Sequence, residues 1–504
     1  MKRKILFSLI SFAVFFILLE TAGRLAEIVL AAPVQPETVR SGWQSEFFSH
    51  YFDWHEPDPD LLWRFRSGLD NPLLKTNSDH LLGDEIEKPK PEKTFRVLIL
   101  GDSSPVGLGL KSRRQGFDNI FEYMLENELA GTGRAEVINA AVSGYTSEQI
   151  GRFMEKKGWG YQPDLVVVYC GNNDASVSGP LSDSALLAGQ VLVWPRTLLD
   201  HLAFYRLAKN LLGRWTASDR SPGSDLAVRV SPDRFYRNLS VLADGCRTHH
   251  CPLVLLKPPV PLLWPAGLQF KVLTHISDPA GQLIFPDEMI RIIGRKVKYC
   301  FNEDFVRELY GEADIYTEEV FNSAYDDPFE PAKAINYYAA KLDEKPDDPL
   351  LLNNLGVSFW ENGQYREADH ILKSARARFR KSHGGELSPA YMSAGAVFLY
   401  NLGINHLALS GVDLSHLHDS SAAAFVYLDS ARQADYFSLR IKNEYWQRLD
   451  SLGALDGVFV ADLSKLFYDN GGEKLFIDHC HPTPEGHRLI ALTLLKIVRD
   501  HSLL

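Results

Sequence analysis

"RVLILGDSSPVGLGL" (96–110) contains four consecutive apolar residues, Val97 to Leu100, followed directly by Gly-Asp-Ser-Ser. A short apolar run that stops at glycine and polar residues is typical of a buried strand that enters a turn. Three interpretations fit this turn: a loop that binds phosphate, a nucleophile placed at the end of a strand, or a polar turn without chemistry. The remaining sequence decides among them.

Further apolar segments of the same kind alternate with segments that have helical periodicity. The apolar segments, which we expect to be strands, are FRVLILG, AEVINAAVSGY, PDLVVVYCGNND, CPLVLLKPP and GVFVADL. Strands that are apolar throughout, separated by helices, are typical of a parallel sheet that is covered on both faces. The sequence therefore predicts an α/β fold with a parallel central sheet.

The N-terminus predicts attachment to a membrane. MKRK is followed by an apolar run from Ile5 to Leu19, and the polarity of the flanks predicts a cytoplasmic N-terminus with an exported body. We expect residues 1–32 to form an uncleaved signal anchor rather than a cleaved signal peptide, because a polar helical stretch separates the apolar run from the small residues before Pro33. Residues 33–92 form an approach segment to the first strand.

The strand signals disappear between residues 290 and 435, where the pattern is helical. Leu352, Leu355, Gly356, Ala368 and Leu372 have the spacing of a tetratricopeptide (TPR) repeat, in which small residues lie where two helices cross. An ordinary antiparallel helix pair is the alternative. In either case, an all-α insertion divides the α/β domain into a first part, residues 93–289, and a C-terminal part, residues 436–504.

Polar stretches at the predicted strand ends carry the chemistry, because ligands of open parallel sheets bind at the carboxyl ends of the strands. Ser103 is the candidate nucleophile, and His481 is the candidate base that a serine hydroxyl requires. Asp478 would orient the imidazole as the third member of a triad. The backbone N–H of Gly144 and the side-chain amide of Asn173 would stabilise an oxyanion, with the Ser103 N–H as a third donor.

These blocks resemble those of the SGNH hydrolase superfamily of GDSL-type esterases. Gly-Asp-Ser with Ser103, a glycine at Gly144, Gly-x-Asn-Asp with Asn173, and Asp-x-x-His with Asp478 and His481 occur in the order of that family. The resemblance implies a three-layer α/β/α sandwich of the flavodoxin-like type. It also implies hydrolysis or transfer of acyl groups through a serine acyl-enzyme, with lipid esters or O-acetylated glycans as substrates.

The neighbouring polar residues receive supporting roles. Asp102 is expected to accept a structural hydrogen bond, Asp174 to brace the loop that carries Asn173, and Ser104 to cap a helix. His479 is expected to face away from His481 or to support it, and His487 to be a surface or core residue.

Other chemistries fit less well. GDSSPVGLGLKS lacks the Gly-Lys-Ser/Thr of a phosphate loop. The DHCH stretch offers metal ligands, but no second pair has zinc-site spacing, so we expect no metal and no cofactor. The net charge of −11 argues against a nucleic-acid partner. Cys246 and Cys251 are close enough in sequence to form a disulfide in an oxidising compartment.

The sequence thus predicts a serine-dependent ester hydrolase in the bacterial inner membrane. It would cross the membrane once, and its catalytic domain would face the periplasm. An O-acyltransferase with the same triad is one alternative. An inactive envelope scaffold that binds a protein partner through its TPR-like helices is another.

Overall fold

A computed structural model of the chain describes residues 20, 21, 24, 54–71, 74–177, 181–188, 227–264, 331–382, 389–411, 422–435, 438 and 440–504. The expected membrane anchor falls almost entirely outside these residues, as does the first part of the expected insertion, residues 290–330. Among the described residues, no helix combines the length and apolar character needed to cross a membrane.

The central sheet has five strands in the order β4-β3-β5-β6-β7. The strands are β3 (Thr94–Gly101), β4 (Arg134–Asn139), β5 (Leu165–Tyr169), β6 (Leu253–Lys257) and β7 (Val458–Asp462). All four pairings are parallel, and in register Val97 of β3 lies opposite Val137 of β4 and Leu165 of β5. The parallel sheet predicted from the sequence is confirmed. The second strand is shorter than expected, since it ends at Asn139, before Gly144.

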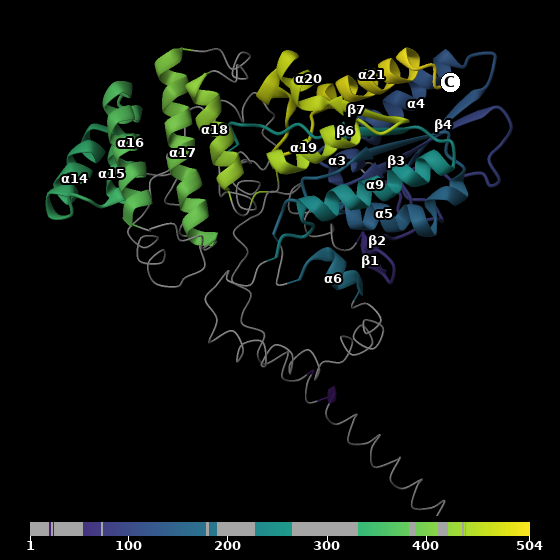
Figure 1. The fold of residues 1–504 in the computed structure, drawn as a ribbon, viewed down its shortest axis with the longest axis horizontal. Coiled ribbons are helices and arrows are strands. Elements are labelled where there is room, and N and C mark those ends of the chain that lie inside the picture. The colour runs from purple at the N-terminus through teal and green to yellow at the C-terminus, as the bar shows by residue number, and fades with distance from the viewer. Residues whose placement is uncertain are drawn as a thin grey trace, which may run out of the picture.

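Helices cover both faces of this sheet (Figure 1). One face carries α5 (Ser147–Lys156), α9 (Pro232–Thr248) and α19 (Asn443–Leu452), and the other carries α4 (Phe117–Glu128) and α21 (Pro484–Asp500). Alternate β3 residues separate into the two apolar layers: Leu98 and Leu100 join the first, and Val97 and Ile99 join the second. This period-two division explains why the strand is apolar throughout.

Shorter elements connect these layers. They are α3 (Ser103–Val106), α6 (Asp183–Ala188), α20 (Leu463–Asp469), and the 3-10 helices at Arg113–Gln115, Gly158–Tyr161 and Gly472–Leu475. Ahead of the sheet, β1 (His55–Asp58) and β2 (Leu62–Phe65) form an antiparallel hairpin, and Phe65 is buried in the first apolar layer. The end of the approach segment is thus part of the folded domain.

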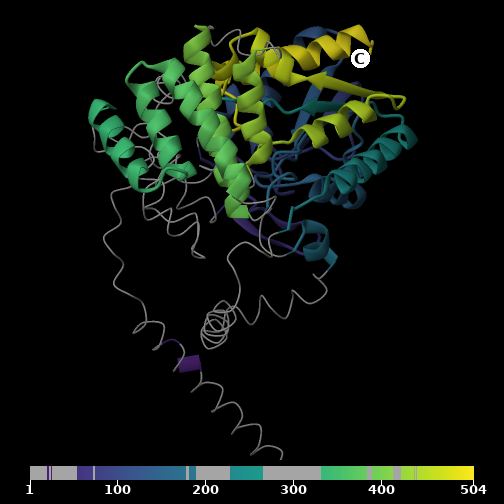
Figure 2. The same cartoon turned by 60° about the vertical axis from the view of Figure 1, so that its left-hand side comes forward.

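A group of helices lies beside the sheet domain, with α18 on the side that faces it (Figures 1 and 2). They are α14 (Pro331–Glu344), α15 (Pro349–Glu361), α16 (Tyr365–Ser382), α17 (Pro389–Ser410) and α18 (Ala423–Ala434), and each contacts the next. We call α14–α18 the helical region. In the chain it stands between β6 and β7.

The helical region contains two similar helix crossings. A Cβ atom at Gly356 of α15 would lie 2.7 Å from Leu372 of α16, and one at Gly403 of α17 would lie 2.5 Å from Leu428 of α18. Both glycines stand in the sequence Asn-Leu-Gly, and both leucines begin Leu-x-Ser-Ala-Arg. Glycine allows the close approach of the helices, and the repeated sequence produces the repeated crossing.

Candidate active site

Ser103 stands at the carboxyl end of β3, between strands β4 and β5. The strand ends at Gly101, where a side chain would collide with the Tyr169 carbonyl oxygen. Asp102 caps α3 by accepting a hydrogen bond from the Ser104 N–H at 2.9 Å, so Ser103 becomes the first residue of the helix. This strand–turn–helix geometry holds the serine above the sheet edge, as expected for a nucleophile at a strand end.

Ser103, His481 and Asp478 form a continuous hydrogen-bonded chain. The Ser103 Oγ lies 2.7 Å from His481 Nε2, and His481 Nδ1 lies 2.6 Å from Asp478 Oδ2. The other carboxylate oxygen of Asp478 accepts from the N–H groups of Cys480 at 3.0 Å and His481 at 2.9 Å. The geometry can activate a serine hydroxyl, because it aligns an acceptor with the hydroxyl and fixes the imidazole from the other side.

The pKa values of Asp478 and His481 shift in opposite directions, as expected for a hydrogen-bonded pair of an acid and a base. Burial alone would raise the pKa of Asp478, but the neighbouring charges of His481 and His479 and the hydrogen bond from His481 hold it well below its usual range. Burial opposes the charged form of His481, but the Asp478 carboxylate outweighs burial and raises the pKa of the imidazole. A raised pKa makes His481 a stronger proton acceptor toward Ser103.

Three groups were expected from the sequence to donate hydrogen bonds to an oxyanion: the N–H groups of Ser103 and Gly144 and the side-chain amide of Asn173. Within the described part of the chain, neither the Ser103 N–H nor the Gly144 N–H donates a hydrogen bond. Gly144 has a positive φ of 83°, which explains why glycine occupies the position. Asn173 Nδ2 donates to the Tyr145 carbonyl at 3.1 Å, which uses one of its two hydrogens and leaves the other for an oxyanion.

The two acidic residues expected in supporting roles are both buried. Asp102 accepts a hydrogen bond from the Ser104 N–H, and burial raises the pKa of Asp102 to about 6. Asp174 accepts from the N–H of Ser147 at 2.9 Å and from its hydroxyl at 2.6 Å, and burial raises the Asp174 pKa to about 7. Asp174 therefore ties the Asn173 loop to the start of α5.

The histidines on either side of His481 have separate roles. His479 is buried next to Asp478, with Nδ1 3.6 Å from Asp478 Oδ1, and its ring stands edge-on to that of His481. Burial lowers the pKa of His479 to about 4. His487 is a core residue of α21 and accepts a hydrogen bond from the Phe117 N–H at 3.2 Å.

Asp478, His479, Cys480 and His481 each offer a metal-ligand atom, and these atoms lie within 4.8 Å of one another. A metal ion held by all four would occupy one ring nitrogen of His481, and it would displace either Asp478 from Nδ1 or Ser103 from Nε2. The cluster therefore cannot serve as a four-ligand metal site and as the triad at the same time.

Cys246 and Cys251 are both buried, and neither forms a disulfide in this structure. The Cys251 N–H donates to the Cys246 carbonyl at 2.9 Å, which brings the two residues together where α9 turns into β6. The bond considered from the sequence is thus not present.

Some residues next to the site had no sequence signal. The Trp63 Nε1 donates to the Ser143 carbonyl at 3.0 Å, and a Cβ at Gly144 would lie 3.2 Å from the indole. The Ile441 N–H donates to Asn172 Oδ1 at 2.9 Å. Trp63 stands in the approach segment and Ile441 follows the insertion, so neither belongs to a recognisable motif.

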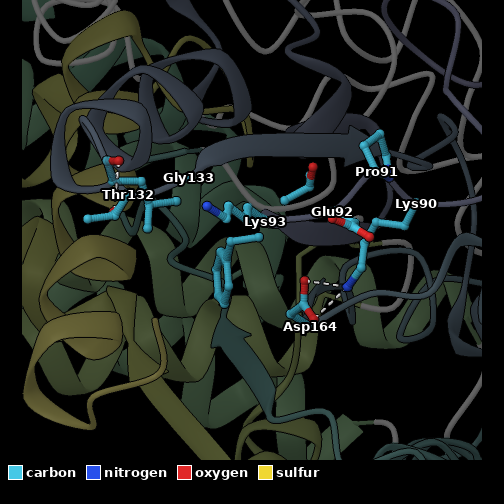
Figure 3. A pocket seen from close by; sticks show the side chains of 10 residues that line it. Lys90, Pro91, Glu92, Lys93, Thr132, Gly133 and Asp164 are labelled. Atoms are coloured by element: carbon cyan, nitrogen blue, oxygen red, sulfur yellow. Dashed lines mark hydrogen bonds and ion pairs between the residues drawn. The ribbon is translucent and has the colours of Figure 1, made fainter.

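A hollow of about 520 Å³ lies at the other end of the sheet, where the strands begin (Figure 3). It is lined by residues such as Lys90, Lys93, Thr132 and Asp164, and Lys90 forms an ion pair with Asp164 at 2.6 Å. The hollow has no member of the triad in its lining.

Residues 99–275 match the GDSL-like Lipase/Acylhydrolase family. This range, about a third of the chain, contains a GDSL-like domain with Ser103, Gly144 and Asn173, and it ends before Asp478 and His481. No curated protein matches the chain.

Several solved structures resemble part of it. TesA is 22% identical and the match covers 33% of this chain and 62% of that one, with a TM-score of 0.20. The psychrotrophic esterase EstA from Pseudoalteromonas sp. is 18% identical (33% and 61% covered, TM-score 0.20). The lipase/acylhydrolase from Enterococcus faecalis is 19% identical (32% and 57% covered, TM-score 0.19). Each match spans about three fifths of the solved chain.

Proposed function

We propose that the protein hydrolyses carboxylic esters with Ser103 as the nucleophile, His481 as the general base and acid, and Asp478 as the residue that orients His481. The observation that carries the proposal is the unbroken chain of short contacts from Ser103 Oγ through His481 to Asp478. The GDSL-like domain at residues 99–275 supports an ester as the substrate class.

In the proposed reaction, Ser103 Oγ attacks the ester carbonyl carbon while His481 Nε2 takes the hydroxyl proton. The oxyanion accepts hydrogen bonds from the Ser103 and Gly144 N–H groups and from Asn173 Nδ2. His481 returns the proton to the departing alcohol, which leaves an acyl group on Ser103. Water then attacks this acyl-enzyme, with His481 again as the base, and releases the acid.

The substrate we propose is an acyl ester of an envelope glycan or lipid, such as an O-acetyl group. The apolar run from Ile5 to Leu19 behind MKRK supports a single-pass anchor with the catalytic domain on the periplasmic side. The repeated helix crossings of α15–α16 and α17–α18 support a TPR-like helical region that could bind a protein partner.

A fluorophosphonate probe tests the catalytic part of this proposal. Mass spectrometry of the labelled full chain should place the adduct on Ser103, and the Ser103→Ala variant should remain unlabelled. Labelling should be slowed strongly in the His481→Ala variant, because the serine hydroxyl then lacks its base. Absence of labelling in the folded wild-type chain would contradict the proposal and favour an inactive scaffold.

A further inference from the structure

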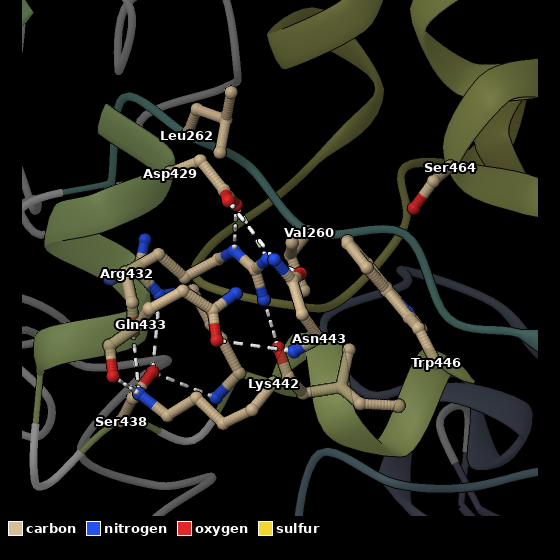
Figure 4. A network of polar contacts seen from close by, with 12 residues as sticks. Val260, Leu262, Asp429, Arg432, Gln433, Ser438, Lys442, Asn443, Trp446 and Ser464 are labelled. Atoms are coloured by element: carbon tan, nitrogen blue, oxygen red, sulfur yellow. Dashed lines mark hydrogen bonds and ion pairs between the residues drawn. The ribbon is translucent and has the colours of Figure 1, made fainter. Parts of the chain in front are cut away.

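After α18 the described residues 440–443 lie against the end of that helix. Lys442 Nζ donates to the carbonyls of Arg432 at 2.5 Å, Gln433 at 3.2 Å and Asp435 at 2.7 Å (Figure 4). The last carbonyls of a helix have no partner within it, so the lysine caps α18.

Arg432, on the last turn of α18, also binds the segment that follows this helix. Its side chain is fully buried, and it donates to the Ile441 carbonyl and, at 2.5 Å, to Asn443 Oδ1 (Figure 4). Asp429 lies 2.6 Å from the guanidinium and balances its charge. The position of Ile441 is therefore fixed relative to α18.

A second arginine ties the segment to the chain that leaves β6. The buried Arg440 donates through Nη1 to the carbonyls of Pro261 at 3.1 Å and Trp264 at 3.0 Å. From α17, the Tyr400 hydroxyl donates to the Leu263 carbonyl at 2.6 Å. Trp264 in turn packs near His479, with their ring centroids 5.9 Å apart.

Ile441 contacts the loop that carries the candidate oxyanion donor. Its N–H donates to Asn172 Oδ1 at 2.9 Å, and its side chain occupies the space that a Cβ at Gly171 would need. Asn172 is buried and directly precedes Asn173 in the chain. The loop is thus held on one side by Asp174 and on the other side by Ile441.

We propose that Arg440 and the Ile441 N–H are positioning groups that set the Asn173 amide for the oxyanion, which makes the helical region an integral part of the active site. This inference rests on the proposed function. An oxyanion donor contributes only when it is held at the right place before the reaction, and small displacements are costly. The hydrogen bonds of Arg440 and Ile441 hold the loop of Asn173 in place, although neither residue belongs to the sequence motifs of the site.

The test compares Arg440→Met with Arg440→Lys and Asn172→Leu in the full chain. With p-nitrophenyl acetate as the substrate, we expect Arg440→Met and Asn172→Leu to lower kcat about tenfold to a hundredfold. KM should stay within about twofold, because the substrate does not depend on this contact for binding. Arg440→Lys keeps a donor and should recover part of kcat.

Arg96→Met is the matched control. Arg96 is also fully buried and also donates to two carbonyls, those of Tyr161 at 2.7 Å and Glu87 at 2.9 Å, but at the opposite end of the sheet. Its loss should lower the melting temperature and leave kcat within about twofold, because no hydrogen bond links it to the oxyanion loop. An equal loss of kcat in Arg96→Met and Arg440→Met would overturn the inference.

Hydrogen–deuterium exchange provides a readout that does not need activity. The amides of Ala175 and Ser176 donate to the carbonyls of Gly171 and Asn173 at 3.1 Å and 3.2 Å. Their exchange should become about tenfold faster in Arg440→Met and Asn172→Leu, and should stay unchanged in Arg96→Met.

The kinetic assay and the exchange measurement together separate failure of the inference from failure of the proposed function. If the wild-type chain turns over no ester and takes no probe, the proposed function is wrong, and the exchange rates alone decide the positioning role. If the wild-type chain is active but Arg440→Met and Asn172→Leu keep both kcat and slow exchange, the inference is wrong. If Arg440→Met does not fold, Asn172→Leu and Arg440→Lys give the same decision.

Discussion

The two ends of the sheet are built differently, although the same strands form both. At the amino ends, Arg96 Nε pairs with Glu136 at 2.6 Å, and Asp164 accepts from Lys90 and from the Arg96 N–H. At the carboxyl ends, the buried side-chain atoms that have no hydrogen-bond partner among the described residues include Asn172 Nδ2, Asp174 Oδ2 and His479 Nδ1.

The contrast indicates what each end contributes. Buried polar groups normally have partners, and those without one reduce the free energy of unfolding. The amino end therefore stabilises the fold, whereas the carboxyl end keeps polar groups that cost stability. Such groups persist where function requires them. The same division should appear in mutants: a loss of activity should follow changes at the carboxyl end and not changes at the amino end.

The largest effect is expected from the triad. Ser103→Ala and His481→Ala should each lower kcat for p-nitrophenyl acetate by at least about a thousandfold, because the nucleophile or its base is lost. Circular dichroism should show a folded protein in both cases. A variant that kept more than about a tenth of wild-type kcat would show that the carboxyl end does not contain the catalytic groups we assign.

A somewhat smaller loss is expected when Asp478 becomes asparagine. Asp478→Asn keeps the shape but lets the imidazole adopt the wrong tautomer, which lowers kcat about a hundredfold to ten-thousandfold. Initial rates at saturating substrate measure this effect. If Asp478→Asn retained full activity, another carboxylate would have to orient His481.

The pH dependence sharpens the assignment of the base. His481 must be neutral to accept a proton, and its pKa is raised above the ordinary value of 6.5. The wild-type kcat/KM should therefore increase with pH and level off only above pH 6.5. In Asp478→Asn the charge that raises the pKa is lost, so the remaining activity should level off at a lower pH. If the wild type and Asp478→Asn levelled off at the same pH, Asp478 would not be the group that raises the pKa of His481.

A moderate effect on stability is expected at Glu473, beyond the carboxyl end of β6. It accepts from the Leu262 N–H at 2.7 Å, and burial raises its pKa to about 7 from 4.5. The folded state holds this proton more tightly than the unfolded state, so the contribution is complete below pH 4.5 and is lost as the pH rises to about 7.

Glu473→Gln keeps an acceptor and has no charge to bury. Its free energy of unfolding should exceed that of the wild type by roughly 3 kcal/mol at pH 8, with the difference shrinking toward zero at pH 4. Urea unfolding at the two pH values measures this. A difference that does not change with pH would show that the carboxyl group is not the cause.

The smallest effect is expected at the amino end. Lys90→Met removes a partly exposed ion pair with Asp164 and should change the free energy of unfolding by less than about 1 kcal/mol. Its kcat should equal that of the wild type. A clear loss of activity in this variant would break the contrast between the two ends of the sheet.

The sequence predicted the parallel sheet because its strands are apolar throughout and end at glycine and polar residues. It also indicated Ser103, Asp478 and His481, since parallel strands bring their carboxyl ends together. It could not indicate Trp63 or Ile441, because those residues act through a backbone atom or an indole face rather than through a motif. Only the packing of distant segments brings them to the site.

The repeat within the helical region was only partly visible for a similar reason. Asn-Leu-Gly and Leu-x-Ser-Ala-Arg occur twice, but the spacing between them differs. Two copies with the same spacing would be recognised as a repeat, but the connections between the paired helices differ in length and hide the similarity of the two copies. The structure shows the relation because Gly356 and Gly403 make equivalent contacts.

The separation of Ser103 and His481 by 378 residues has a consequence for the order of events during synthesis. A ribosome completes β3 and its serine long before the helical region, and it makes His481, the proposed base, only after the helical region and β7. Because domains fold as their residues emerge, the nucleophile waits without a partner through most of translation. The growing chain thus has no base for Ser103 until the segment after β7 has been made, and a chain cut before Asp478 would keep its serine and have no means to activate it.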